Sequence, residues 1–345
     1  MNAPDPARVA PSAADRAPAP VPAPSEPEHY VPKHELRFVT AASLFDGHDA
    51  AINIMRRILQ DSGVEVIHLG HNRSVAEVVE AAIEEDAHGI AISSYQGGHM
   101  EYFKYAKDLL DERGSGHIKV FGGGGGVIIP EEIEELHAYG IDRIFSPEDG
   151  RKLGLQGMID AMMQRADVDL PHDTPLEGPF PDVDPSDHRL VAQLLTQAES
   201  DGFAESGLRA SLLAKHAALP QAELAPVIGV TGTGGAGKSS LVDELVLRFL
   251  QGSQDARVAI LSIDPSRRRT GGALLGDRIR MNSLPHPRAT MRSFATRDAR
   301  GELSAAVEDA VKVCQVAGYD WVIVETSGIG QGDTEITEVS DLSLY

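Results

Sequence analysis

The chain has 345 residues, 42% of them apolar, which is enough for two ordinary domains with real cores. Its formal net charge of −21 argues against a nucleic-acid partner, because nucleic acids are bound by clustered Lys and Arg. No apolar run approaches the roughly 20 residues of a membrane span, the N-terminus lacks a signal-peptide pattern, and the single cysteine, Cys314, excludes internal disulfides. We therefore expect a soluble protein in a reducing compartment, the cytoplasm.

Residues 1–34 differ from the rest of the chain in composition. They are mostly Ala, Pro, Ser and Asp, and such a segment cannot bury enough apolar surface to offset the entropy lost on ordering. We predict a disordered tail there.

Residues 35–165 alternate between strand-like and helix-like patterns. Ser74-Val75-Ala76-Glu77 has the form of a helix-capping box, and Pro130 stands where a helix would begin. The predicted strands are 36–40, 64–69, 89–94, 118–121 and 141–145. Strands joined by crossover helices predict an α/β domain with a flavodoxin-like, doubly wound parallel sheet.

Three groups of unusual residues follow strands of this domain. Asp46-Gly47-His48 follows the first strand, Ser93-Ser94-Tyr95 ends the third, and Gly122 to Gly126 follows the fourth. Ligands of open α/β sheets bind at the carboxyl edge, so these groups are expected to meet there. Consecutive glycines add unfolded-state entropy, and they are best explained by a backbone that approaches something large and flat.

With this spacing, the three groups resemble the cobalamin-binding domain of acyl-CoA mutases, whose pattern is D-x-H-x-x-G, then S-x-L, then G-G. The resemblance implies that His48 is the lower axial ligand of the cobalt, and that Asp46 fixes the tautomer of its imidazole. The implied cofactor-binding residues are His48, Asp46, Gly47, Ser93, Tyr95, Gly122, Gly123 and Gly124. Ser93 and the glycine run would line the slot for the nucleotide tail of the cofactor.

The sequence departs from the family pattern at two positions. Ala51 replaces the usual glycine, which crowds the loop, and Tyr95 replaces the usual leucine, which narrows or re-polarises the tail slot. The alternative interpretation is a flavodoxin-like domain in which Asp-x-His occurs by chance.

Residues 166–225 are interpreted as a linker with a helical segment. The stretch 167–187 is rich in Pro and Asp, and helical periodicity returns over 190–213.

Residues 226–345 begin with a buried strand and the sequence Gly232-Thr233-Gly234-Gly235-Ala236-Gly237-Lys238-Ser239, which fits the phosphate-loop pattern G-x-x-x-x-G-K-[ST]. Lys238 would reach the terminal phosphates as the catalytic lysine, and the Ser239 hydroxyl would hold Mg²⁺. The predicted nucleotide-binding residues of the loop are Gly234, Gly235, Ala236, Gly237, Lys238, Ser239 and Ser240. The alternative is a glycine-rich turn without a ligand.

Acidic residues follow two later strands of this domain. Asp264 ends the strand 258–263 and Glu325 ends the strand 321–324, while Asp277 lies between them in the chain. Carboxylates beside a phosphate loop supply the hard oxygen ligands that Mg²⁺ requires.

Together with Thr270-Gly271-Gly272 and the motif that begins at Glu325, these residues resemble the G-protein chaperones that accompany cobalamin-dependent mutases, which are P-loop proteins of the SIMIBI type. The resemblance implies that Asp264, Asp277 and Glu325 hold Mg²⁺ with Ser239. It also implies that Arg280 contacts the nucleotide and that segments 264–281 and 326–335 are nucleotide-dependent switches. The Asn-Lys-x-Asp motif that reads guanine does not occur, and we expect the domain to continue beyond Tyr345.

A cobalamin domain followed by such a G domain resembles the fused isobutyryl-CoA mutase family. The resemblance implies adenosylcobalamin, Mg²⁺ and GTP as cofactors, and a radical rearrangement of isobutyryl-CoA to n-butyryl-CoA. It further implies a GTPase that gates cofactor loading and protection, a homodimer, and an acyl-CoA-binding barrel that this chain lacks. Two alternatives stay open: a stand-alone cobalamin carrier or regulator, and a P-loop kinase on a flavodoxin-like domain.

Overall fold

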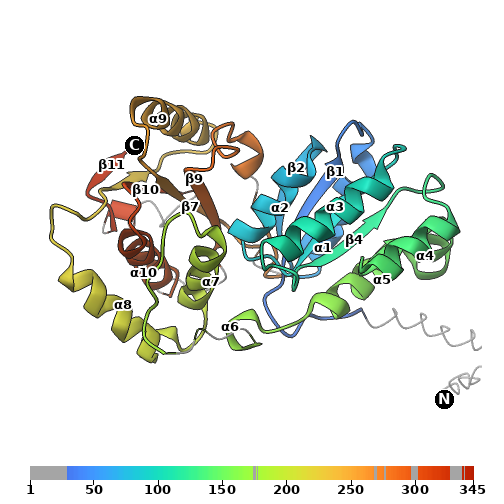
Figure 1. Cartoon of the computed structure of the whole chain (residues 1–345), viewed down its shortest axis with the longest axis horizontal. Coiled ribbons are helices and arrows are strands. Elements are labelled where there is room, and N and C mark those ends of the chain that lie inside the picture. The colour runs from blue at the N-terminus through green and yellow to red at the C-terminus, as the bar shows by residue number, and fades with distance from the viewer. Residues whose placement is uncertain are drawn as a thin grey trace, which may run out of the picture.

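The structure is a computed structural model that describes residues 29–173, 176, 178–267, 270–275, 277–296, 302–326, 336–337 and 339–345, without the side chains at 49, 277 and 302–304. Figure 1 shows two α/β lobes side by side, with α6 between them. Up to α5, the elements are β1 (Arg37–Ser43), α1 (Asp49–Asp61), β2 (Glu65–Arg73), α2 (Val75–Glu84), β3 (Gly89–Ser93), α3 (His99–Glu112), β4 (Lys119–Gly123), α4 (Pro130–Tyr139), β5 (Arg143–Phe145) and α5 (Pro147–Ala166). They are followed by α6 (Leu170–Asp173), α7 (His188–Glu199), η2 (Phe203–Glu205), α8 (Gly207–Ala218), β6 (Val227–Val230), α9 (Lys238–Gly252), β7 (Val258–Asp264), β8 (Ala273–Leu275), η3 (Asp277–Arg280), β9 (Ala289–Ala295), α10 (Glu302–Ala317), β10 (Trp321–Thr326) and β11 (Leu342–Leu344). None of the described helices is long and apolar enough to cross a membrane.

The first lobe is built on a parallel sheet. Among the described residues its strand order is β5-β4-β3-β1-β2-β8, and the first five strands have the flavodoxin-like order that the sequence predicts. The order reverses at β1 and β3, whose carboxyl ends therefore border the crevice in which ligands of such sheets bind. The predicted capping box of α2 is present, since Ser74 accepts a hydrogen bond from the Glu77 N–H.

Each face of this sheet is covered by helices that bury an apolar stripe. Helices α2, α3 and α4 cover one face through residues such as Val78, Phe103 and Leu136. Helices α1 and α5 cover the other face, where Leu59 and Met162 pack against the sheet. The first lobe thus has the layered core expected of a doubly wound domain.

The second sheet carries the phosphate-loop sequence. Its strand order among the described residues is β11-β6-β10-β7-β9, and all its strands are parallel. Helix α9 covers one face through Val242 and Val246, while α7, α8 and α10 cover the other. The fold class predicted for both halves of the chain is confirmed.

The predicted linker is more ordered than we expected. The helical pattern over 190–213 is interrupted between α7 and α8, because Gly202 takes a left-handed φ of 84° ahead of the short helix η2. Within 167–187, Phe180 is buried in the core shared by α7 and α8. This segment therefore packs onto the second lobe instead of merely joining two domains.

The last residues of the predicted tail, 29–34, pack against the first lobe. Residues 29–34 contact α5's C-terminal cap, where Asp167 accepts hydrogen bonds from the Tyr30 hydroxyl at 2.5 Å and from the His34 ring at 2.7 Å. A carboxylate that accepts several hydrogen bonds holds a short segment that has no apolar core of its own. Residues 1–28 of the predicted tail lie outside the described residues.

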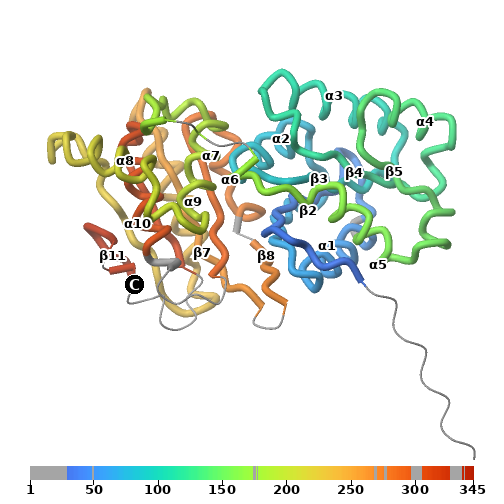
Figure 2. Tube along the Cα trace, turned by 90° about the horizontal axis from the view of Figure 1, so that it is seen from below, coloured from blue at the N-terminus to red at the C-terminus, as the bar shows by residue number. Residues whose placement is uncertain are grey.

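Strand β8 joins the sheet of the first lobe although it lies in the chain between β7 and β9. It pairs in parallel with β2, with Glu65 opposite Ala273 and Ile67 opposite Leu275. Figure 2 shows β8 beside β2, at the junction of the lobes. This pairing could not be predicted from the sequence, because Ala-Leu-Leu is as typical of a buried loop as of an edge strand.

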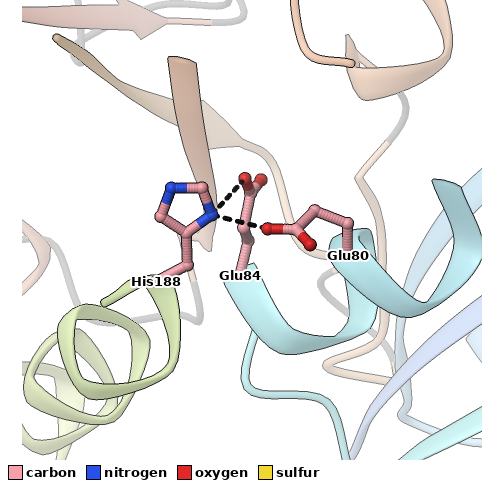
Figure 3. Close-up of side chains that lie close together, drawn as sticks. All are labelled: Glu80, Glu84 and His188. Atoms are coloured by element: carbon pink, nitrogen blue, oxygen red, sulfur yellow. Dashed lines mark hydrogen bonds and ion pairs between the residues drawn. The ribbon is translucent and has the colours of Figure 1, made fainter. Parts of the chain in front are cut away.

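Charged side chains are buried where the lobes meet. Figure 3 shows His188 from α7 pointing at two glutamates one turn apart on α2: its Nδ1 lies 2.5 Å from Glu80 Oε1 and 3.4 Å from Glu84 Oε1. Burial alone would lower the pKa of His188, but the hydrogen bond to Glu80 and the negative charge of Glu84 outweigh it, so the pKa is raised. His188 therefore joins the two lobes through its contacts with Glu80 and Glu84.

We expect His188→Gln to destabilise the protein most at low pH. A raised folded-state pKa stabilises the folded protein fully below the unfolded-state pKa of about 6.5, and that contribution is lost as the pH rises through the folded-state value. Near pH 6 the variant should lose about 1.5–3 kcal/mol, the contribution of a hydrogen bond to a charged group. Urea unfolding at several pH values measures this, and a difference that does not change with pH would contradict it.

Candidate functional site

The Asp46–His48 pair lies at the carboxyl end of β1, where the strand order of the first sheet reverses. His48 occupies the N-cap position of α1 without a capping hydrogen bond from its side chain, which is 74% exposed, whereas that of Asp46 is 0% exposed. The His48 Nδ1 lies 2.9 Å from Asp46 Oδ1. Because an ionised carboxylate only accepts hydrogen bonds, Nδ1 carries the proton, and Nε2 is the ring atom left to bind a metal from the exposed side.

Asp46 is held by two elements of the sheet edge. It accepts hydrogen bonds from the backbone N–H of His48 at 2.8 Å and from that of Tyr95, after β3, at 2.6 Å. Burial alone would raise the pKa of Asp46, but these hydrogen bonds and the His48 ring outweigh it and lower the pKa. The Tyr95 ring lies beside the imidazole with centroids 5.5 Å apart. The structure thus brings together the predicted residues that follow β1 and β3.

Ser93, at the same edge of the sheet, is a second candidate for contact with a ligand. Ser93 is buried at the end of β3, and among the described residues its Oγ has no hydrogen-bond partner. Buried hydroxyls are nearly always paired, so an orphaned one is a natural partner for a polar ligand atom. This observation fits the predicted slot for a cofactor tail.

The glycine run after β4 is required partly by the protein's own packing. A Cβ on Gly122 would lie 2.2 Å from the Phe103 ring, and a Cβ on Gly124 would lie 1.9 Å from the Ser94 carbonyl oxygen. Gly126, in contrast, has no heavy atom within 4 Å of its Cβ position. A ligand is therefore not the reason for the whole run, because contact with Ser94 after β3 and with α3 already demands two of the glycines.

The phosphate-loop sequence joins β6 to α9 as predicted. Gly235 and Gly237 take left-handed φ values of 80° and 92°, which L side chains rarely adopt. Lys238 opens α9, and its ammonium donates to the loop carbonyls of Gly232 at 2.8 Å and Thr233 at 3.2 Å. The loop, together with Leu344 and Tyr345, lines a cavity of about 340 Å³. Backbone N–H groups at a helix N-terminus beside a lysine are suited to bind phosphate.

Two of the predicted magnesium ligands meet in the structure. The Ser239 hydroxyl donates to Glu325 Oε1 at 2.7 Å, and both residues are buried. Glu325 lies opposite Val230 of β6, directly before the loop, and opposite Ser262 of β7. Asp264 is buried two residues further along β7, at the same edge of the sheet.

Other predicted residues of this site are less fully described. Asp277 opens η3, but its side chain is outside the description, as are residues 327–335 of the second predicted switch. Arg280 closes η3 and is exposed. Sequence reasoning missed Arg278, the buried neighbour of Asp277, because nothing in Gly-Asp-Arg-Ile-Arg distinguishes a buried arginine from an exposed one.

A further group of metal-ligand type occurs at the lobe junction. Among the described residues, Glu80, Glu84 and His188 offer three ligand atoms within 4.8 Å of one another. However, Arg113 donates to Glu80 at 2.7 Å and Arg278 to Glu84 at 2.7 Å. Because these arginines already pair with the two carboxylates, we assign the group as an ion-pair cluster and not as a metal site.

Comparison with known families defines the class of protein. Residues 36–155 match the B12 binding domain family, and residues 191–345 match the family of the methylmalonyl Co-A mutase-associated GTPase MeaB. The chain is therefore a cobalamin-binding domain followed by a GTPase domain of the MeaB type.

The most informative relatives are fused isobutyryl-CoA mutases. That of Geobacillus kaustophilus is 61% identical over 320 residues, which cover 92% of this chain and 29% of the relative. That of Cupriavidus metallidurans is 61% identical over 315 residues, which cover 91% of this chain and 28% of the relative. A putative GTPase of Pyrococcus horikoshii is 40% identical over 156 residues, 45% of this chain and 47% of its own length. The resemblance to the fused isobutyryl-CoA mutase family is thus confirmed, and the chain spans less than a third of the length of those mutases.

We expect Gly124→Ala to destabilise the protein by about 1–3 kcal/mol, because its methyl group would overlap the Ser94 carbonyl and force the backbone of β3 or of the glycine run to move. Gly126→Ala is the matched control, with an expected change within about 0.5 kcal/mol. Denaturant unfolding of the two variants tests this, and equal stabilities would show that the run has no packing role.

Proposed function

We propose that the chain is the cobalamin- and GTP-binding part of an adenosylcobalamin-dependent mutase that converts isobutyryl-CoA to n-butyryl-CoA. The observation that carries the proposal is the exposed His48 imidazole, held by a buried carboxylate at the switch point of the first sheet, in a chain that also has a phosphate loop. The order of the two domains and the identity to fused isobutyryl-CoA mutases support it, and favour it over a stand-alone cobalamin carrier.

In this proposal the first lobe holds the cofactor by residues of three loops. His48 would bind cobalt through Nε2, with Asp46 keeping the proton on Nδ1 and raising the basicity of the ring. The Ser93 hydroxyl and the backbone at Gly123 would face the nucleotide tail. When bound, adenosylcobalamin supplies the radical that starts the rearrangement, and the protein supplies orientation and exclusion of water.

The second lobe would hydrolyse GTP with Mg²⁺. Lys238 would neutralise charge on the transferred phosphoryl group, and Ser239 with Asp264 and Glu325 would hold the metal directly or through water. We further propose that hydrolysis gates loading and protection of the cobalamin, as a chaperone would. The acyl-CoA would bind to a barrel outside this chain, and the full protein would be a cytoplasmic homodimer; these points rest on the family resemblance.

We expect the chain to bind cobalamin with His48 as the lower ligand. Electron paramagnetic resonance of bound cob(II)alamin should show the splitting of a single axial nitrogen, and the pattern should change when histidine is labelled with ¹⁵N. His48→Ala should abolish the label-dependent change, and Asp46→Asn should weaken binding by about 10–100-fold.

His172→Ala is the control, because His172 is 85% exposed and lies between the lobes. Ser93→Ala should weaken binding without loss of stability, since the hydroxyl has no partner among the described residues. The assignment would be overturned if the spectrum of the unmodified chain did not change with the label, or if the label-dependent change persisted in His48→Ala.

We also expect hydrolysis of GTP to require Lys238 and Mg²⁺. Lys238→Ala should lower kcat by about 10²–10³-fold, the loss seen when one charge-stabilising donor is removed from a transition state. Phosphate release in the presence and absence of EDTA measures this, with Lys152→Ala on the exposed face of α5 as the control. Hydrolysis that persists in Lys238→Ala would place the activity elsewhere.

A further inference from the structure

The elements β8 and η3, here called the coupling strap, lie in the second half of the sequence, but β8 pairs with the sheet of the first lobe and η3 lies between β2 and α9. They follow β7, whose last residue is the predicted magnesium ligand Asp264, and they precede β9. Both neighbours lie in the phosphate-loop sheet, whereas β8 lies in the sheet that carries His48. The chain thus leaves the phosphate-loop sheet after β7, pairs with the first sheet at β8, and returns to the phosphate-loop sheet at β9.

The end of the strap is fixed to the helix that begins at Lys238. Directly after η3, Asn282 and the Ser283 N–H both donate to Asp243 of α9, at 2.9 Å and 2.8 Å. Met281 is buried in the core beneath α9. Two hydrogen bonds and one core side chain therefore connect the phosphate-loop helix to the residues that directly follow the strap.

The body of the strap is fixed to the first lobe. The Ala273 N–H donates to the Val64 carbonyl at 3.3 Å, at the start of β2. Arg278 is buried, and its guanidinium donates to Glu84 at 2.7 Å and to Glu85 at 3.2 Å, both at the end of α2. Charge-assisted hydrogen bonds of this kind leave little freedom of orientation.

The strap reaches the loop that carries the cobalt ligand by way of β2. Ile279 covers Gly70, whose Cβ position would lie 2.7 Å from Ile279 Cδ1 and whose φ is 80°. Two residues further along β2, the Asn72 side chain accepts the Phe45 N–H at 2.9 Å. Phe45 directly precedes Asp46, the residue that fixes the His48 imidazole.

We propose that the coupling strap links the nucleotide site to the cobalamin site inside one chain, with Arg278 as the positioning residue that ties it to the first lobe. Nucleotide binding at the phosphate loop shifts the strap, and the strap shifts β2 and the Phe45–His48 loop. Because binding linkage is reciprocal, cobalamin then alters nucleotide affinity by the same factor. The inference rests on the proposed binding of both ligands and adds the physical route between them.

Hydrogen exchange on the unmodified chain tests the route. The probe is guanylyl imidodiphosphate with Mg²⁺, a GTP analogue that is not hydrolysed. We expect slower exchange in the phosphate loop and, in addition, altered exchange in the peptides that cover the strap, β2 and the Phe45–His48 loop. Protection of the phosphate loop alone would contradict the proposed coupling through the strap, while the assignment of the nucleotide site would stand. If the phosphate loop is not protected, the assignment of the nucleotide site is wrong, and the proposed coupling is wrong as well.

The coupling itself is measured as the ratio of cobalamin dissociation constants without and with the analogue. We expect a ratio of about 5–150-fold in the unmodified chain. Ile279→Ala should bring this ratio close to one while the chain still binds each ligand alone, because the side chain is partly exposed and covers Gly70 of β2. Leu153→Ala is the matched control, an equally exposed apolar residue on α5, and should leave the ratio unchanged.

Arg278→Lys provides a second variant. Lysine keeps the buried positive charge but cannot contact both glutamates with the fork of a guanidinium, so the ratio should again fall. If this variant does not fold, Ile279→Ala still decides the question. An unmodified chain with a ratio of one, or an Ile279→Ala chain with an undiminished ratio, would overturn the proposal.

Discussion

The arrangement of the two lobes depends on a layer of buried charge at their junction. Arg278 pairs with Glu84 and Glu85, and Arg292 pairs with Glu199 of α7, while the Glu85 carboxylate also accepts hydrogen bonds from Ser293. Removing one partner from such a pair costs about 3–5 kcal/mol, because it leaves an uncompensated charge out of water. An apolar junction could be as stable, but it would tolerate sliding, whereas paired guanidinium and carboxylate groups fix the direction of each contact.

This constraint explains why the helical segment between the domains is ordered. Helix α7 supplies His188 at its start and Glu199 at its end, so both termini of one helix are tied to the junction. Glu199 also accepts a hydrogen bond from Arg37, at the start of the first strand of the first sheet. Helix α7 is therefore held in two ways: its apolar face packs in the core of the second lobe, and His188 and Glu199 contact charged residues of the first lobe.

Residues of the candidate cofactor site also contribute to the packing of the first lobe. Gly122 and Gly124 are demanded by Phe103 and Ser94, so they shape the carboxyl edge of the sheet even without a ligand. Asp46 fastens the ends of β1 and β3 together and at the same time sets the tautomer of His48. If this edge binds the cofactor as proposed, the same atoms serve the fold and the ligand, and only Ser93, whose hydroxyl has no partner among the described residues, would serve the ligand alone.

The sequence by itself determined the class of both folds and supplied the motifs from which both candidate sites are predicted. The sequence shows local patterns: apolar strands, helix caps, and the fixed spacing of Asp46-x-His48 and of Gly232 to Ser239. Such patterns can be recognised without knowledge of the fold. Only the tertiary structure decided that Ala273–Leu275 pairs with β2 and that Arg278 is buried against α2. Three apolar residues and one arginine in a loop have no periodicity of their own. Their place is set by the edge of a strand and by two carboxylates about 190 residues earlier in the chain, partners that only the folded protein brings into contact.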